Sequence, residues 1–382
     1  MKENIPFETP TTASLRMRLL AWRNRVLGSQ RFQRFAARNP LLRPVARRRA
    51  AALFDLVAGF TYTQTLFAVV ETGLLDRLGN GPAQLAALAA GSGLPREATM
   101  RLLRAAAAID IVELVEDDWW ILGRHGAALQ SNEGALAMIR HHRILYKDLA
   151  DPVSLLAASD RKGTQLAQFW QYAAAGDGTE SSQAMAAEYS KLMAASQNAV
   201  GQEVLAAFPF SRAHSLLDIG GGTGAFLRIV SSAHPQLKLG LFDRPDVVAL
   251  AGDVYAGEAN AVPPDFHSGD FFTDSLPQGY DLVSLVRILH DHDDEPAQRL
   301  LGNIHRALEP GARLIIAEPM ADTPGARGMG DAYFGWYLWA MASGRPRSAE
   351  EIRSMLRRAG FASSRKLTTR QPVITSLIVA TA

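Results

Sequence analysis

A short apolar strand that runs directly into a glycine-rich turn constrains the fold of this chain more than any other feature. The run Leu216 to Ile219 is followed by Gly220-Gly221-Gly222-Thr223-Gly224 and then by a segment with helical character, Ala225 to Ala233. Glycine reaches positive φ without strain and has no Cβ, so the backbone of such a turn can approach a bound molecule closely. The first N–H groups of the helix then point at the same molecule. The pattern predicts a site for a nucleotide-like cofactor, with a tight turn that binds nothing as the alternative.

Two acidic residues that follow later apolar runs point to the same kind of ligand. Asp243 ends the run Leu237 to Phe242, about 20 residues beyond the glycine turn, where a carboxylate can bind both hydroxyls of a ribose. Asp270 follows the next predicted strand, and its neighbour Phe271 is suited to cover an adenine ring. Aspartate is also common in turns and as a helix cap, so a purely structural role stays open for each of these residues.

The glycine spacing by itself leaves a dinucleotide possible. G-x-G-x-G differs from the dinucleotide fingerprint G-x-G-x-x-G, whose third glycine comes one place later. Ala225 stands at that later place. An NAD-dependent dehydrogenase is disfavoured because no Tyr-x-x-x-Lys or comparable hydride-transfer motif accompanies the turn.

In their order and spacing, the motifs of the C-terminal half resemble those of S-adenosylmethionine-dependent O-methyltransferases of the plant caffeate and bacterial small-molecule type. The matching segments are Asp218 to Gly224, Phe242 to Pro245, Gly269 to Phe272 and Arg287 to Glu295. Two further segments, Phe54 to Gln64 and Met329 to Ser348, look most like the carotenoid hydroxyl methyltransferases of purple phototrophic bacteria, which methylate hydroxyneurosporene and demethylspheroidene.

The resemblance implies a homodimeric enzyme with S-adenosylmethionine as cofactor, S-adenosylhomocysteine as product and no metal. The implied acceptor is the tertiary hydroxyl of an acyclic carotenoid, and a phenolic polyketide or quinone is the alternative. A regulator that senses S-adenosylmethionine is a further class left open. The residues expected to contact the cofactor are Asp218, Gly220, Gly222, Gly224, Asp243, Asp270, Phe271 and Arg287.

The candidate general base is His290, just beyond the predicted strand Asp281 to Val286. An imidazole titrates near neutral pH and can accept a proton from a hydroxyl. The resembled family has its catalytic histidine at this position, and Glu318 matches the first of two carboxylates that orient it. His292 replaces the family's tryptophan and is either a second titrating group or a packing residue. The second carboxylate is missing, because the corresponding segment reads Arg345-Pro346-Arg347-Ser348.

Apolar and aromatic residues near these motifs predict a pocket that suits a long hydrophobic alcohol better than a charged substrate. Tyr337 and Met341 precede Ser343-Gly344, and Tyr189 and Met193 lie on successive turns of the predicted helix Gln183 to Phe208. Ordinary core packing is the alternative for all four.

Strands and helices alternate in the C-terminal half, which predicts an α/β, Rossmann-like domain with a mostly parallel sheet buried on both faces. Upstream, helical periodicity and two short strands predict a mostly helical, winged-helix-like unit, which the resemblance assigns to dimerisation. Its predicted recognition helix, 96–104, continues into Ala105-Ala106-Ala107-Ala108-Ile109 and is too rich in alanine to read bases, so we expect no nucleic-acid partner. The expected segments are an arm (1–50), a dimerisation domain (51–180) and a methyltransferase domain (181–382). The predicted strands are Leu216 to Ile219, Leu237 to Phe242, Asp265 to Ser268, Asp281 to Val286, Arg313 to Glu318 and Val373 to Ala380.

The arm has an unusual charge distribution. Between Thr9 and Leu53 there are eleven arginines and no Asp or Glu, although the whole chain carries a net charge of only +2. Leucines and aromatic residues interleave with these arginines, a composition typical of an amphipathic helix on an anionic membrane surface. A solvated basic face, or contacts to acidic residues of a partner subunit, is the alternative.

The absence of cysteine rules out disulfides and thiolate metal sites, which fits a reducing cytoplasm. The apolar runs look too short or too interrupted to span a bilayer, and the polar beginning of the chain does not resemble a signal peptide. We therefore expect a cytoplasmic protein, with peripheral contact to the inner or photosynthetic membrane as an open addition.

Overall fold

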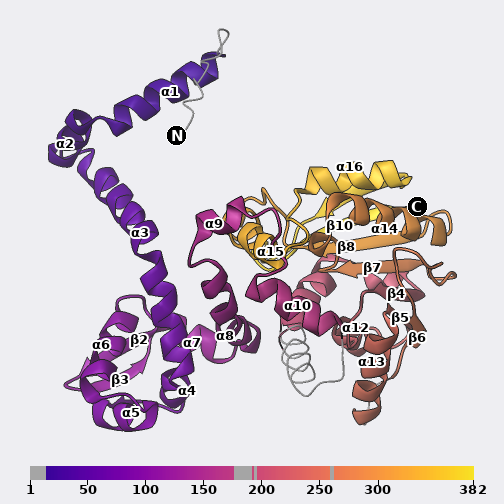
Figure 1. Cartoon of the computed structure of the whole chain (residues 1–382), viewed down its shortest axis with the longest axis horizontal. Helices are drawn as coiled ribbons and strands as arrows, with labels where there is room; N and C mark the ends of the chain where they lie inside the picture. The colour runs from indigo at the N-terminus through magenta and orange to yellow at the C-terminus, as the bar shows by residue number, and fades with distance from the viewer. Residues whose placement is uncertain (1–13, 176–191, 193–195, 259–261) are drawn as a thin grey trace. The chain divides into compact units, whose positions relative to one another are not determined.

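The structure, a computed structural model, describes residues 14–175, 192, 196–258 and 262–382, and these pack into two compact units (Figure 1). The first unit contains the described residues up to Leu74 together with Pro82–Gly123. The second contains Leu75–Gly81 and the described residues from Arg124 to Ala382.

The second unit is built on a seven-stranded sheet with the order β6-β5-β4-β7-β8-β10-β9. Five strands pair in parallel and β10 runs antiparallel to β8 and β9. The order reverses beside β4, and ligands of such sheets bind where the strands end at this switch point. The strands are β4 (Ser215–Ile219), β5 (Lys238–Asp243), β6 (Asp265–Ser268), β7 (Leu282–Val286), β8 (Arg313–Glu318), β9 (Ser363–Leu367) and β10 (Ser376–Thr381).

Helices cover both faces of this sheet (Figure 1). The helices α12 (Ala225–Ala233) and α13 (Pro245–Gly257) pack on one face, where Leu227 and Ala251 join the buried side chains of the strands. On the other face lie α14 (Asp294–Ala307) and α16 (Ala349–Ala359), which bury Leu300 and Leu356. The sheet is therefore apolar on both sides, which explains the continuous apolar runs of its central strands.

A further group of helices lies in the second unit beyond the sheet. Leu145, Leu166 and Leu338 form an apolar cluster there with Tyr337 and Met341. Residues 196–207 are helical as well. The named helices are α7 (Arg124–Gln130), α8 (Glu133–Asp148), α9 (Pro152–Ala157), α10 (Gln165–Ala175), η1 (Phe210–Arg212), η2 (Leu289–Asp291), the π-helical η3 (Gly328–Phe334) and α15 (Gly335–Met341).

The first unit combines helices with a small antiparallel sheet of order β1-β3-β2. Two strands of this sheet, β2 and β3, follow two short helices, as expected from the sequence of this region, and β1 precedes these helices. The elements are α1 (Leu15–Gly28), α2 (Gln30–Arg38), α3 (Arg43–Glu71), β1 (Ala83–Gln84), α5 (Leu85–Ser92), α6 (Arg96–Ala107), β2 (Val112–Glu116) and β3 (Trp119–Leu122), and α4 (Leu74–Gly79) follows α3 at the junction with the second unit.

The α/β fold class is confirmed, but one strand was missed and one expectation is wrong. The strand β9 was not predicted, because Ser363–Leu367 is a polar edge strand without an apolar run. The expectation that no apolar run could span a bilayer is wrong by length and composition. In the described part of the chain α3 is one such helix, with 29 residues and only 11% of its most apolar window buried.

Candidate active site

The glycine turn between β4 and α12 is left-handed at every second residue. Gly220, Gly222 and Gly224 have φ angles of 71°, 58° and 78°. A Cβ at Gly220 would lie 2.5 Å from Ile288, and one at Gly224 would lie 2.7 Å from the ring of Tyr255. Gly222 meets nothing within 4 Å, so a ligand can approach the backbone from that side.

Asp243, at the end of β5, faces this turn. Its Oδ2 accepts the Gly222 N–H at 2.8 Å, and its Oδ1 accepts the Arg244 N–H at 2.8 Å. Each carboxylate oxygen keeps acceptor capacity for a further hydrogen bond. Burial raises the pKa of Asp243. This acceptor beside an open backbone turn fits the ribose of an adenosine-containing cofactor.

Asp218 is buried beneath the glycine turn, whereas a residue in contact with the cofactor was expected. It is only 2% exposed in β4, and its Oδ1 accepts the Ser284 hydroxyl at 2.6 Å. Its Oδ2 would lie 3.0 Å from a Cβ at Gly221, so the carboxyl group lies directly beneath the turn. Burial raises its pKa to about 7. Asp218 therefore supports the turn, and a direct contact with the cofactor stays a prediction.

Asp270 and Phe271 follow β6 as expected. Asp270 is exposed, and its Oδ1 accepts the Phe272 N–H at 2.8 Å. The rings of Phe271 and Phe272 pack edge to face, and each also contacts the ring of His292, at centroid distances of 5.7 and 5.0 Å. Burial lowers the pKa of His292. These contacts favour the packing reading of His292.

The candidate base and its orienting carboxylate are brought together from two neighbouring strands. His290 lies in η2, just after β7, and its Nδ1 is hydrogen-bonded to Oε2 of Glu318 at the end of β8. Oε1 of Glu318 accepts the backbone N–H groups of Ile288 and Leu289 at 3.1 and 2.7 Å. Glu318 thus holds both the imidazole ring and the turn that carries it.

The carboxylate of Asp291, which was not predicted from the sequence, contacts the other ring nitrogen. Oδ1 of Asp291 lies 3.1 Å from Nε2 of His290. The only signal for it in the sequence is its position next to His290. Burial disfavours the charged imidazole, but the Asp291 and Glu318 carboxylates outweigh this and hold the pKa of His290 above its ordinary value. Burial raises the pKa of Asp291.

Arg287 precedes the turn that carries His290 and has a left-handed backbone with φ of 59°. This conformation is uncommon for a residue with a side chain and often marks functional sites. Its Nη1 donates to the Ser196 hydroxyl at 2.6 Å. A contact between Arg287 and the cofactor stays a prediction.

The predicted pocket residues are only partly described. Tyr337 and Met341 of α15 are buried at 4% and 8% exposure, while Tyr189 and Met193 lie outside the described residues. Next to them, the Phe334 ring packs edge to face against His290 at a centroid distance of 5.6 Å. An aromatic ring therefore adjoins the candidate base, His290, directly.

Two histidines of α8 that the sequence analysis did not single out lie beside these aromatic residues. Nε2 of His141 is 2.8 Å from the Tyr337 hydroxyl, and Nε2 of His142 is 2.8 Å from the Tyr333 hydroxyl. Burial lowers the pKa of both histidines to about 4, so both are neutral at neutral pH. Nothing in their sequence context distinguishes them from ordinary core residues.

The chain matches two family models. Residues 146–362 match an O-methyltransferase domain, and residues 54–126 match an O-methyltransferase dimerisation domain. A demethylspheroidene O-methyltransferase of Rhodobacter capsulatus is 42% identical over 93% of this chain and 88% of its own length. An acetylserotonin O-methyltransferase of Rattus norvegicus is 30% identical over 81% of this chain and 72% of its own.

Solved structures show the same fold. A methyltransferase of calicheamicin biosynthesis, bound to S-adenosylhomocysteine, has a TM-score of 0.72 and 27% identity, and the match covers 87% of this chain and 98% of that one. A mitomycin 7-O-methyltransferase has a TM-score of 0.72 and 24% identity over 88% of this chain and 100% of its own. With its methyltransferase domain, its dimerisation domain and curated relatives along most of its length, this chain belongs to the O-methyltransferase family.

Proposed function

We propose that this enzyme transfers a methyl group from S-adenosylmethionine to the tertiary hydroxyl of an acyclic carotenoid of the demethylspheroidene type. The observation that carries the proposal is the 42% identity to a demethylspheroidene O-methyltransferase over 93% of the chain. The aromatic residues that adjoin His290 support it, because they favour a hydrophobic acceptor.

The proposed cofactor site lies at the carboxyl ends of β4 and β5. Gly222 supplies an open backbone turn, and Asp243 supplies acceptors for ribose hydroxyls. Phe271 is expected to cover the adenine, and Arg287 to pair with the carboxylate of the methionine moiety. When bound there, S-adenosylmethionine supplies the electrophilic methyl group.

In this proposal His290 takes the proton of the acceptor hydroxyl as the oxygen attacks. Glu318 fixes the ring through Nδ1 and, with Asp291, stabilises the imidazolium that forms. The Nε2 atom faces Asp291 in the present arrangement, so the hydroxyl must reach the ring beside or in place of that carboxylate. A tertiary alcohol is a weak acid, so exclusion of water and alignment of the oxygen contribute together with proton removal.

The test is a transfer assay with labelled S-adenosylmethionine and a panel of acceptors. We expect methyl transfer to demethylspheroidene or hydroxyneurosporene and none to phenols of polyketide or quinone type. Turnover of the phenols alone would replace the carotenoid assignment with that class. Binding of S-adenosylhomocysteine, measured by a rise in Tm, checks the cofactor separately, and stabilisation by NAD alone would refute it.

We further propose that two copies of the chain associate through the first unit. The dimerisation domain of residues 54–126 supports this. On α3 the side chains of Phe54, Leu56, Val57 and Phe60 are 63%, 81%, 68% and 70% exposed, an apolar strip that a second copy would bury. Light scattering should give twice the chain mass of 41.4 kDa, and a monomer at micromolar concentration would refute the association.

We also propose that the arm, residues 14–49, lies on an anionic membrane surface. Leu15, Leu19 and Trp22 follow one another at helical spacing along α1 and are 73%, 56% and 62% exposed. Arginines flank this stripe, and their stems can lie along apolar surface while the guanidinium groups reach phosphates. The family model of dimerisation begins only at residue 54, whereas the match to the carotenoid enzyme covers 93% of the chain and so includes part of the arm.

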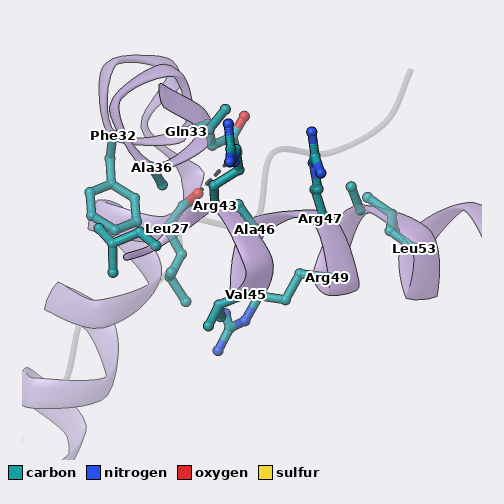
Figure 2. Close-up of a pocket in the computed structure, with 13 residues that line it drawn as sticks. Leu27, Phe32, Gln33, Ala36, Arg43, Val45, Ala46, Arg47, Arg49 and Leu53 are labelled. Carbon is teal, nitrogen blue, oxygen red and sulfur yellow. Dashed lines mark hydrogen bonds between the residues drawn. The ribbon is translucent and has the colours of Figure 1, made fainter. Parts of the chain in front are cut away.

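A hollow of about 560 Å³ between α1, α2 and α3 adds to this surface (Figure 2). Leu27, Phe32 and Leu53 line it together with alanines, and Arg43 and Arg47 stand at its edge (Figure 2). Apolar walls with cationic edges suit the acyl chain and phosphate of an anionic phospholipid. A carotenoid dissolves in the same bilayer, so this contact would place the enzyme where its acceptor is.

Vesicle sedimentation tests the arm. The wild type should bind vesicles of phosphatidylglycerol more strongly than vesicles of phosphatidylcholine, and salt should weaken the binding. Changing Arg16, Arg18, Arg23 and Arg25 to Gln should reduce it, while the same change at Arg96 and Arg101 of α6 should not. If the arm variant keeps full vesicle binding the proposal fails. If it instead becomes monomeric, the arm contacts the partner subunit.

A further inference from the structure

The segment Ser343–Arg347, which follows α15, contacts every backbone carbonyl of the turn that carries His290. The Arg347 guanidinium donates to the carbonyls of Leu289 and His292 at 2.8 and 2.7 Å. The Arg345 N–H donates to the carbonyl of His290 at 3.0 Å. The Ser343 hydroxyl donates to the carbonyl of Asp291 at 2.7 Å. Four consecutive carbonyls of the turn 289–292 are thus held from one side.

The backbone of this segment fits the turn so closely that no side chain is tolerated at its centre. Gly344 has φ of 77°, and a Cβ there would overlap the carbonyl oxygen of His290 and lie 2.9 Å from Cα of Asp291. The Gly344 N–H also donates to the Asp293 carboxylate at 3.0 Å. The two segments are therefore in direct backbone contact.

Arg347 is the centre of this arrangement. Its side chain is 1% exposed and lies against Asp294, whose Oδ1 accepts Nε at 3.0 Å and Nη2 at 2.8 Å. Only the planar fork of a guanidinium can reach two carbonyls and a carboxylate at once. Burying the charge of an arginine costs free energy unless all of its hydrogen-bond partners are in place. Arg347 therefore favours the one conformation of the turn in which all of these partners reach it.

We propose that Arg347 is a positioning residue for His290 and takes over part of the orienting role of the second carboxylate that is absent from this segment. Glu318 holds the turn through its N–H groups and Arg347 holds it through its carbonyls, so the imidazole is fixed from both sides. The inference rests on the proposed role of His290 as the base.

The test compares Arg347→Met and Arg347→Lys with the control Arg357→Met. Arg357 of α16 also pairs with a carboxylate, that of Glu350 at 3.2 Å, but its side chain is 55% exposed and donates to none of the four carbonyls of the turn. We expect Arg347→Met to lower kcat by about 10²-fold, because a misplacement of about 1 Å is enough for such a loss. The KM for the acceptor and the affinity for S-adenosylhomocysteine should change only a few-fold. The kcat of Arg357→Met should stay within about three-fold of the wild type.

A readout without substrate separates this inference from the proposed reaction. The proton between Nδ1 of His290 and Glu318 should give a downfield NMR signal that shifts or disappears in Arg347→Met and remains in Arg357→Met. Arg347→Lys keeps the positive charge but lacks the planar fork, so it should behave like Arg347→Met if the fork is essential. It also serves as the second variant if Arg347→Met does not fold. A wild-type kcat and an unchanged signal in either Arg347 variant would overturn the inference. If His290→Ala keeps wild-type turnover, the proposed base is wrong, while the NMR signal still decides the role of Arg347.

Discussion

Asp291→Asn offers a quantitative test of the electrostatics around the base. A general base must be neutral to accept a proton, so the rate falls as the pH drops through the pKa of His290. The structure raises this pKa above the ordinary value of about 6.5, and the acidic limb of the wild-type pH profile should therefore lie above pH 6.5. Asn keeps the shape of Asp291 and removes its charge, so His290 should stay neutral to lower pH.

The size of the effect follows from the distance. Asp291 Oδ1 lies 3.1 Å from His290 Nε2, and both side chains are largely buried, at 22% and 5% exposure. An opposite charge within ~4–6 Å shifts a pKa by about 1–3 units, and each unit corresponds to about 1.4 kcal/mol. We expect the acidic limb of Asp291→Asn to move down by about 1–3 units, with Glu318 still supplying the remaining favourable charge.

The assay measures kcat/KM for methyl transfer between about pH 5 and 9, because kcat/KM reports the pKa of the free enzyme. Asp253→Asn on α13 makes the same chemical change at an exposed position and should leave the profile unchanged. A limb that stays in place or moves to higher pH in Asp291→Asn would refute the reasoning, since it would mean that Asp291 does not stabilise the charged form of His290.

Four further substitutions test the site. His290→Ala should lower single-turnover rates by about 10²-fold or more, while the affinity for S-adenosylhomocysteine stays within a few-fold of the wild type. His292→Ala should have a much milder effect, because the His292 ring packs against aromatic residues. Near-wild-type methyl transfer by a folded His290→Ala enzyme would make His290 a structural residue. Asp243→Ala should weaken binding of S-adenosylhomocysteine by about 1–3 kcal/mol, measured by calorimetry, and unchanged affinity would leave Asp243 as a turn residue. Gly344→Ala should lower kcat strongly, since its Cβ overlaps the His290 carbonyl, and a wild-type rate would show that the turn can move without loss.

Local chemistry was enough to predict the core of the fold. The glycine turn after an apolar run predicted β4, the turn and α12, because positive φ and a missing Cβ are properties that only glycine supplies freely. The apolar runs predicted the buried parallel strands for a similar reason. His290 and Glu318 were named as partners through family resemblance, and the structure brings their side chains together.

The contacts that hold His290 and its turn were decided only by the tertiary structure. The Arg345-Pro346-Arg347 segment looks in the sequence like the loss of a carboxylate, yet Arg347 is buried there by two carbonyls and Asp294, which lie 53 or more residues away along the chain. Nothing in the sequence pointed to Asp291 except its position next to His290, because its contact with the imidazole depends on the direction of a side chain within one short turn. Sequence patterns record which elements are apolar or able to turn, whereas a hydrogen bond between distant segments depends on where the whole sheet places them.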